Sequence, residues 1–172
     1  MDVDDITIAG NSHRAVQRFK DELSSCYGIK DMGNLRWLLC IGIDRDQKNP
    51  MISFSQAAYV QKIVEHFGME DANPLSRPIT PGHNLSKSQS PVSDSDIEEM
   101  RDIPYREAVS SLMYVVVGTQ PDIAYAVSYL ERFMANPGCA HWEAVKQVIR
   151  YLKGMKDEIG RASCRERVSP YV

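Results

Sequence analysis

The sequence predicts an α+β fold in which a small β-hairpin is followed by helices. Two apolar runs, 37–44 and 51–55, flank a polar turn, which is the pattern of a hairpin. Apolar residues then recur at the spacing of one helix face over 105–117, 122–134 and 140–152. At 172 residues, of which 43% are hydrophobic, the chain can form one domain or two small lobes with a real core.

A strand and a helix are predicted ahead of the hairpin. Residues 3–9 are mainly apolar and predict a buried strand. Asn11 or Ser12 can cap a helix that runs to about Tyr27, because such side chains accept hydrogen bonds from free backbone N–H groups. The apolar residues of this helix fall on one face, namely Val16, Phe19, Leu23 and Cys26.

A further helix and a long connector are predicted after the hairpin. Residues 56–67 have apolar residues at helical spacing, and Gly68 follows as a C-cap. The segment 71–103 is rich in Pro, Ser and Asp and has few large apolar residues, which is typical of a partly mobile connector. Because so long a connector is unusual inside one compact domain, we expect a lobe boundary there.

Apolar positions also predict the inward faces of the last three helices. In chain order they are Tyr105, Ala108, Val109, Leu112, Met113, Val116 and Val117; Ile123, Ala126, Val127, Leu130, Phe133 and Met134; and Ala144, Val145, Val148, Ile149 and Leu152. Thr119 and Asp122 have the spacing of a capping box, with Pro121 in the first turn. Gly138 and Gly154 stand where the second and third helices are expected to end.

Composition excludes several classes of protein. The formal net charge of -3 argues against a self-sufficient nucleic-acid binder, which is usually basic. The four cysteines are widely spaced, so neither a zinc knuckle nor a disulfide framework is indicated. There is no signal peptide and no long apolar run, so we expect a soluble intracellular protein without a membrane partner.

Two adjacent carboxylates, Asp4 and Asp5, stand at the first predicted strand. Divalent magnesium and manganese take hard oxygen ligands, and a carboxylate-held metal pair can clamp the attacking and leaving oxygens in phosphoryl transfer. A short Asp cluster is equally typical of a solvated turn. Asp2-Val3-Asp4 also has the Asp-x-Asp form of a glycosyltransferase metal site, which would require a nucleotide-binding α/β half ahead of it.

A series of motifs runs in order along about residues 2–156. They are Val3-Asp4-Asp5-Ile6, Lys30 to Leu35, Leu39 to Arg45, Ser55 to Tyr59, Phe67-Gly68-Met69, Pro104 to Val109, Ser111 to Tyr114, Pro121 to Ser128, Arg132-Phe133-Met134, His141-Trp142 and Arg150 to Gly154. In this order they resemble the reverse transcriptases of copia-type LTR retrotransposons. The resemblance implies a C-terminal fragment of the reverse-transcriptase region of a Pol polyprotein.

That resemblance implies a division of the chain into four parts. Residues 1–55 would be the C-terminal part of the palm with its hairpin, which lies where related polymerases position the primer end. Residues 56–103 would be a thumb-like helix and the mobile connector, and 104–156 a helical connection toward RNase H. Residues 157–172 match nothing in the family and resemble translated adapter sequence, so we expect them to be non-native.

The resemblance also implies the chemistry. Asp4 and Asp5 would be catalytic residues and ligands of Mg²⁺ or Mn²⁺ in the intact enzyme, with Asp4 the stronger ligand. The other catalytic Asp and the fingers of the family lie upstream of Met1, so these 172 residues alone are expected to bind no metal and to be inactive. Asp2 stands where the family has an aromatic residue, and Cys40 and Gly42 stand where it prefers Gly and Glu.

The implied partners are an RNA template, a DNA primer and the remainder of the Pol polyprotein. Lys62, on the thumb-like helix, and Lys146, Arg150 and Lys153, spaced i, i+4, i+7, are candidate phosphate contacts, although solvated helix faces carry the same pattern. The implied location is a cytoplasmic virus-like particle or the nucleus. The alternative function is a non-catalytic helical scaffold that binds nucleic acid or a partner chain.

Overall fold

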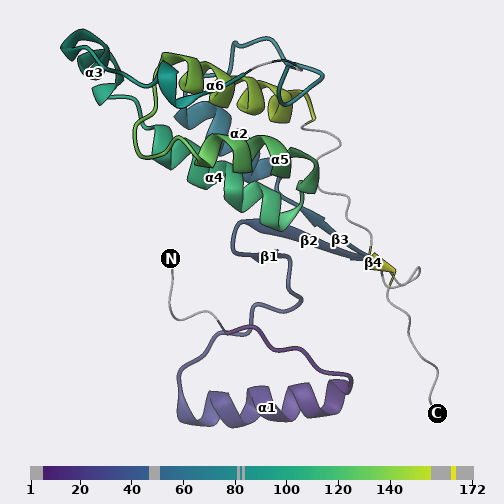
Figure 1. Ribbon diagram of the computed structural model, residues 1–172. Coiled ribbons are helices and arrows are strands. Elements are labelled where there is room, and N and C mark those ends of the chain that lie inside the picture. Colours follow the sequence, from purple (N-terminus) through teal and green to yellow (C-terminus); the bar gives the residue numbers. More distant parts are fainter. Residues whose placement is uncertain (1–5, 47–50, 81, 83, 156–163, 166–172) are drawn as a thin grey trace.

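The computed structural model describes residues 6–46, 51–80, 82, 84–155 and 164–165. Its elements are α1 (His13–Cys26), β1 (Trp37–Leu38), β2 (Ile41–Asp46), β3 (Met51–Ser55), α2 (Ala57–His66), the 3₁₀ helix η1 (Lys87–Gln89), α3 (Asp94–Arg101), α4 (Tyr105–Gly118), the 3₁₀ helix η2 (Pro121–Ile123), α5 (Ala124–Glu131), α6 (Cys139–Gly154) and β4 (Cys164–Arg165). Helices α2, α4, α5 and α6 gather at one end of the molecule, α1 lies at the other, and the strands run between them (Figure 1). The predicted α+β class is confirmed.

The sheet is antiparallel with the order β1-β2-β3-β4, and its centre is the predicted hairpin. Strands β2 and β3 pair in a register that sets Ile43 opposite Phe54. The predicted strand 37–44 is broken by a tight turn at Leu39 and Cys40, whose φ angles are 49° and 62°. Two central residues with positive φ form the turn that matches the twist of a hairpin, so this run supplies two strands, β1 and β2.

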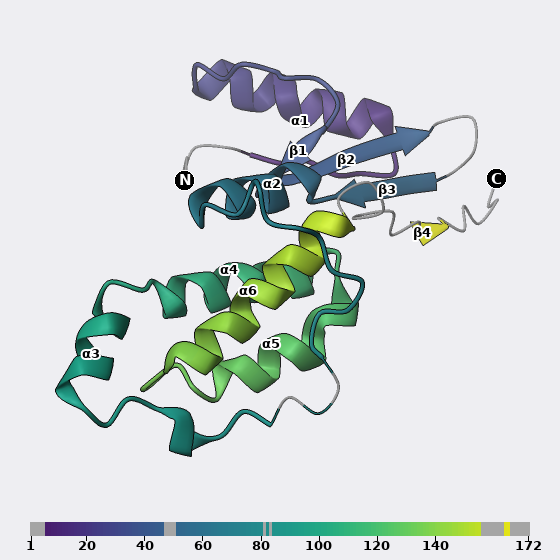
Figure 2. The same ribbon diagram turned by 90° about the horizontal axis from the view of Figure 1, so that it is seen from above.

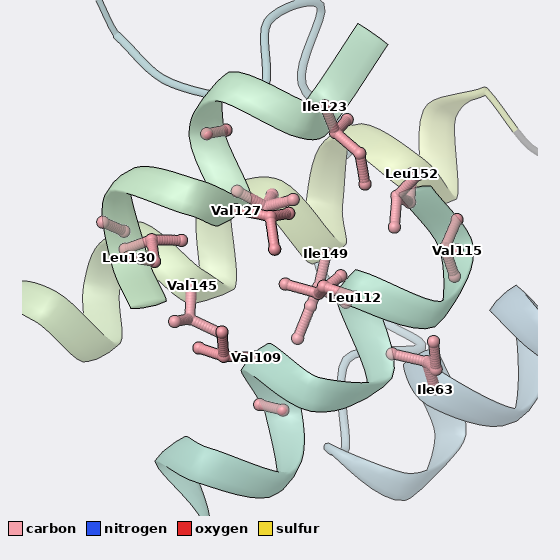
Figure 3. Packing of buried hydrophobic residues seen from close by; sticks show 14 of the residues in the cluster. Ile63, Val109, Leu112, Val115, Ile123, Val127, Leu130, Val145, Ile149 and Leu152 are labelled. Atoms are coloured by element: carbon pink, nitrogen blue, oxygen red, sulfur yellow. The ribbon is translucent and has the colours of Figure 1, made fainter. Parts of the chain in front are cut away.

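One apolar core joins α2, α4, α5 and α6. The core contains Leu112 of α4, Leu130 of α5 and Leu152 of α6, none of which has exposed surface. Ile63 of α2 joins them and is 4% exposed. Figure 3 shows side chains from these helices pointing toward one another. Packing of amphipathic faces supplies most of the stability of such helices, because short helices are marginal in isolation.

The predicted inward face of α4 is partly wrong. Val115 is fully buried, whereas Met113 is 36% and Val117 is 85% exposed. Residues 113–117 are all apolar, so periodicity cannot choose among them, and the packing of α4 against its neighbours decides the face. The predicted inward positions of α6 are all buried, as expected.

The predicted capping box at Thr119 and Asp122 is also wrong. Gln120 precedes η2, and no side chain caps it. The Thr119 hydroxyl instead donates to Gln56 Oε1 at 2.9 Å, and Asp122 Oδ2 accepts from the Tyr151 hydroxyl at 2.7 Å. Tertiary partners compete for these side chains and replace the local cap.

The connector 71–103 contains two helices that its composition did not predict, η1 and α3. Ser93 caps α3 by accepting from the N–H of Asp96 at 3.2 Å, and acidic residues fill its first turn, where they favour a helix N-terminus. Met100 is the buried residue of α3. With a single buried side chain, α3 lacks the apolar periodicity that identifies a helix in sequence. Mobility of the connector stays a prediction.

The N-terminal part has no core of its own. Helix α1 begins where predicted, with Ser12 accepting from the Ala15 N–H, yet none of its residues is buried. No described residue ahead of Gln56 is buried, and Phe19 and Trp37 are 47% and 60% exposed. Of the predicted strand 3–9, residues 6–9 are irregular and 3–5 lie outside the described residues.

None of the helices in the described ranges is long and apolar enough to cross a membrane. The view from above shows α4, α5 and α6 as one layered group with α3 at its margin (Figure 2).

Replacing Leu112 or Leu130 by Ala should lower the free energy of unfolding by about 2–5 kcal/mol, because each truncation leaves a cavity in the core. Urea denaturation followed by far-UV circular dichroism measures the loss. Val117→Ala is the control, with an expected change within about 0.5 kcal/mol because its side chain is exposed. Losses as small as the control's at both leucines would contradict the packing.

Candidate nucleic-acid interface

The predicted catalytic carboxylates, Asp4 and Asp5, lie outside the described residues. Within the described part of the chain, no three His, Cys, Asp or Glu side chains are close enough to hold a metal ion. The geometry available for a site therefore consists of the hairpin, α2 and the helices that support them.

The hairpin is fixed to α4 at its first turn. The Tyr114 hydroxyl of α4 donates to the backbone carbonyl of Leu39. Tyr59 of α2 meets the Tyr114 ring edge to face, with 5.0 Å between centroids. Burial raises the pKa of the Tyr114 hydroxyl above its ordinary value, which keeps it a donor. The β1–β2 turn therefore has a defined position relative to the helices.

The start of α2 is fixed to the end of α4 by a buried amide. Gln56 has no exposed surface; its Oε1 accepts from Thr119 and its Nε2 donates to the Tyr114 carbonyl at 3.5 Å. Gly118 makes room for it, since a Cβ there would lie 2.3 Å from Gln56 Oε1. Sequence reasoning missed this junction, for which a glycine at the end of an apolar helix was the one available signal.

The turn residue Cys40 has a backbone conformation that favours glycine. Its φ of 62° lies in the left-handed region, which costs a residue with a Cβ roughly 1–2 kcal/mol and glycine almost nothing. Leu39, at φ 49°, carries the same kind of strain, and its side chain is 66% exposed. The turn thus presents apolar and thiol groups on a constrained backbone.

Helix α2 presents Lys62 to solvent, without an ion pair to any described residue. Its neighbour on the next turn, His66, approaches Glu107 of α4 at 3.0 Å. The Phe67 ring meets Trp142 of α6 at 6.1 Å between centroids. Helix α2 is therefore packed along one side, while Lys62 stands on its open side.

The three cations of α6 are engaged within the protein. Arg150 Nε donates to the Asn73 carbonyl at 2.6 Å, and Lys153 Nζ donates to the Ala72 carbonyl at 2.8 Å. Lys146 pairs with Glu143 on the same helix. The contacts of Arg150 and Lys153 hold the segment after α2 against α6. Arg150 uses one of its five N–H donors in this contact, and the predicted nucleic-acid role of the three residues stays a prediction.

The motif Lys30 to Leu35 has a local structural explanation. Asp31 Oδ1 accepts from the N–H of Gly33 at 2.9 Å, which turns the chain where Gly33 has a φ of 78°. Lys20 of α1 donates to the same carboxylate at 2.9 Å. Both hydrogen bonds hold the pKa of the Asp31 carboxyl below its ordinary value, so the carboxylate stays charged.

Motifs in the C-terminal half contact one another. The Tyr105 hydroxyl donates to the Leu130 carbonyl at 2.9 Å, and Arg106 Nε donates to the Met134 carbonyl at 2.9 Å. Tyr151 and Asp122 form the hydrogen bond described above. These motif residues bind helix to helix, which accounts for them without a role in chemistry.

His141 holds the connector to the start of α6. Its Nδ1 accepts from the Gly138 N–H at 2.8 Å, and its Nε2 lies 3.2 Å from the Ser86 carbonyl, to which it donates in this tautomer. The side chain is fully buried and stacks on Phe133 at 4.1 Å between centroids. Burial lowers the pKa of the His141 imidazole below its ordinary value, although the Ser86 carbonyl acts in the opposite direction.

Comparison with known proteins gives one family and several relatives. The family model described as Reverse transcriptase (RNA-dependent DNA polymerase) matches residues 1–81. The Retrovirus-related Pol polyprotein from transposon TNT 1-94 of Nicotiana tabacum is 40% identical over 88% of the chain and 11% of its own length. The corresponding protein from transposon RE1 of Arabidopsis thaliana is 34% identical, over 88% of the chain and 10% of its length.

An uncharacterized mitochondrial protein of Arabidopsis thaliana is 33% identical over 88% of the chain and 59% of its own length. The chain thus spans about a tenth of the two polyproteins and less than two thirds of this shorter relative. No solved structure matches the chain.

Replacing Cys40 by Gly should stabilise the hairpin, because glycine adopts the left-handed conformation without a Cβ clash. The expected gain is about 0.5–1 kcal/mol after the greater backbone entropy of unfolded glycine is subtracted. Hydrogen exchange of the Ile43 amide, which donates to the Arg36 carbonyl, reports local opening. Cys40→Ala keeps the Cβ and should give no gain; equal protection in both variants would show that the turn is not strained.

The pH dependence of stability should follow His141. Because burial favours the neutral imidazole, the unfolded chain binds its proton first, at a pKa of about 6.5. The stabilisation is complete above that pH and is lost as pH falls below it toward the lower folded pKa. Denaturation at several pH values, comparing wild type with His141→Asn, tests this, because Asn can still accept from Gly138 N–H but does not titrate. An unchanged pH slope in the variant would contradict the assignment.

Proposed function

The chain belongs to the reverse-transcriptase region of copia-type retrotransposon Pol polyproteins, and we propose that within the whole polyprotein it serves RNA-directed DNA synthesis. The observation that carries the proposal is the 40% identity to a Pol polyprotein over 88% of the chain, with the reverse-transcriptase model matching residues 1–81. That matched range contains Asp4, Asp5, the hairpin and α2.

In this proposal Asp4 and Asp5 hold Mg²⁺ or Mn²⁺ in the intact enzyme, together with a further carboxylate of the polyprotein. Paired carboxylates have the donor chemistry for such ions, since hard divalent cations prefer oxygen ligands. The bound ion would stabilise the charge that develops on the attacking and leaving oxygens. These residues lie outside the described part of the chain, so the sequence alone supports their role.

The hairpin and α2 would position the nucleic acid as the end of the palm and a thumb-like helix. Two features support this role. Hydrogen bonds of Tyr114 and Gln56 fix the hairpin and the start of α2 to α4. Lys62 stands on the open side of α2, where it can contact a phosphate of any sequence. The remaining unit, α4–α6, would be the connection that supports both elements.

The remainder of the polyprotein would be a direct partner of the N-terminal part. Soluble proteins rarely leave large contiguous apolar surfaces uncovered. The described residues ahead of Gln56 include no buried side chain, and Ile6, Tyr27 and Trp37 are each at least 60% exposed. Packing against other parts of the reverse transcriptase would bury this surface.

Primer extension on an RNA template tests the catalytic assignment. In a whole reverse-transcriptase region that includes this chain, Asp4→Asn and Asp5→Asn should each reduce extension by at least about 100-fold, because each removes a ligand of the charge-stabilising ion. Asp71→Asn, at an exposed position, is the control and should retain activity. Full activity in both Asn variants would refute the assignment.

The 172 residues alone should not extend a primer, because the family places a further catalytic Asp and the fingers outside them. The assay uses the same primer and template with Mg²⁺ or Mn²⁺. Extension by the isolated chain that disappears in Asp4→Asn would contradict this expectation.

A further inference from the structure

A column of aromatic rings leads from the buried core to the surface along α5. Tyr125 and Tyr129 are stacked, with 6.2 Å between ring centroids and 12° between ring planes. Tyr129 meets Phe133 edge to face at 5.8 Å, and Phe133 stacks on the buried His141. The outer member, Tyr125, is 77% exposed.

The inner rings of this column are held in place. The Tyr129 hydroxyl donates to the Leu85 carbonyl at 2.8 Å, which fixes the position of the hydroxyl end of the ring. The Arg132 guanidinium carbon lies 5.5 Å from the centre of the Tyr129 ring, a cation–π distance. Tyr125 therefore rests on a ring that is already ordered, so an added ring on its open side would meet a preformed surface at little entropic cost.

From this arrangement we propose that the open face of Tyr125 is a stacking site for an unpaired base of single-stranded nucleic acid, with the Arg132 guanidinium beside the next ring of the column, Tyr129. The proposal deepens the proposed function by assigning a strand contact to the helical unit, far along the chain from Asp4 and Asp5. An aromatic face accepts any base, and the Arg132 guanidinium, which lies beside Tyr129, offers a positive charge to a phosphate of the same strand. Bases inside a duplex are already stacked on one another and do not offer a free face.

The surroundings of Tyr125 favour a base over a protein partner. A protein contact of comparable strength centres on an aromatic anchor within a desolvated apolar patch. The other exposed residues of α5 are Ser128 and Glu131, and the exposed Arg132 follows the helix; all three are polar or charged. An exposed ring whose exposed neighbours along the helix are polar suits a single stacked base better than an apolar docking surface.

Crosslinking with an oligouridine that carries 5-iodouracil tests the contact directly. The full 172-residue chain is irradiated with this strand, and the crosslinked peptide is identified by mass spectrometry. We expect crosslinks to Tyr125. Crosslinks confined to other segments would overturn the proposal.

Binding of a fluorescent oligouridine, measured by anisotropy at low salt, gives the size of the effect. Tyr125→Ala should weaken binding by roughly 5- to 150-fold, the range expected for loss of one stacked base. Tyr125→Phe should bind like wild type, because the ring is kept. Tyr27→Ala removes a tyrosine of similar exposure that takes part in no described ring stack, and it should have no effect. Equal binding by Tyr125→Ala and wild type would refute the stacking site.

An abasic strand of the same length separates stacking from charge. Tyr125→Ala and wild type should bind it equally, whereas Arg132→Gln should weaken binding of both strands. If Tyr125→Ala weakens the abasic strand as much as oligouridine, the ring does not act by stacking and the proposal fails. These outcomes are independent of primer extension, so a failure here can be told from a failure of the catalytic assignment.

Discussion

The burial of α6 is the constraint on which the rest of the structure depends. Ala144, Val145, Val148, Ile149 and Leu152 are each no more than 1% exposed. Helices α2, α4 and α5 all pack against this helix, so removing its apolar face would expose three others at once. Polar side chains of α6 also hold other segments against it. Arg150 and Lys153 bind the segment that follows α2, and His141 binds the segment around Ser86. Because interiors are close-packed, these contacts define one arrangement.

The position of the hairpin is derived from this core. Gln56 connects the start of α2 to the end of α4, and Tyr114 connects the middle of α4 to the β1–β2 turn. The Gln56 amide is fully buried and would be costly to leave unpaired, whereas the hydrogen bond from Tyr114 to Leu39 lies at the surface. The N-terminal end has no such core, since α1 forms without burying any residue. The helical end of the chain has an apolar core, whereas the described residues ahead of Gln56 leave their apolar side chains partly or fully exposed.

The residues that carry the family resemblance divide into two groups with different physical explanations. In the helical unit most of them bind other parts of the same chain, as Tyr105, Arg106 and Tyr151 do. In the N-terminal half, Asp31 and Gly33 shape a turn, and Cys40 has a left-handed backbone conformation that favours glycine. Folding thus accounts for much of the resemblance. The groups that we propose to act on a substrate or a strand are Asp4 and Asp5, Lys62 and Tyr125, and the roles of Lys146, Arg150 and Lys153 stay predictions.

The sequence by itself determined the α+β class, the hairpin, α1, α2 and the approximate ranges of α4, α5 and α6, because each is encoded locally by apolar period, caps and turn residues. Ordered motifs also determined the family, and residue chemistry singled out Asp4 and Asp5. Only the tertiary structure decided that Val115 and not Val117 is buried, that Thr119 binds Gln56, that α3 forms within the connector, and that residues 6–9 form no strand. Each of these depends on a partner distant in sequence. The continuous apolar run at 113–117 has no preferred face until a neighbouring helix packs against it. The Thr119 hydroxyl donates to an acceptor that folding brings close to it. A strand such as the one predicted at residues 3–9 forms only when another strand pairs with it.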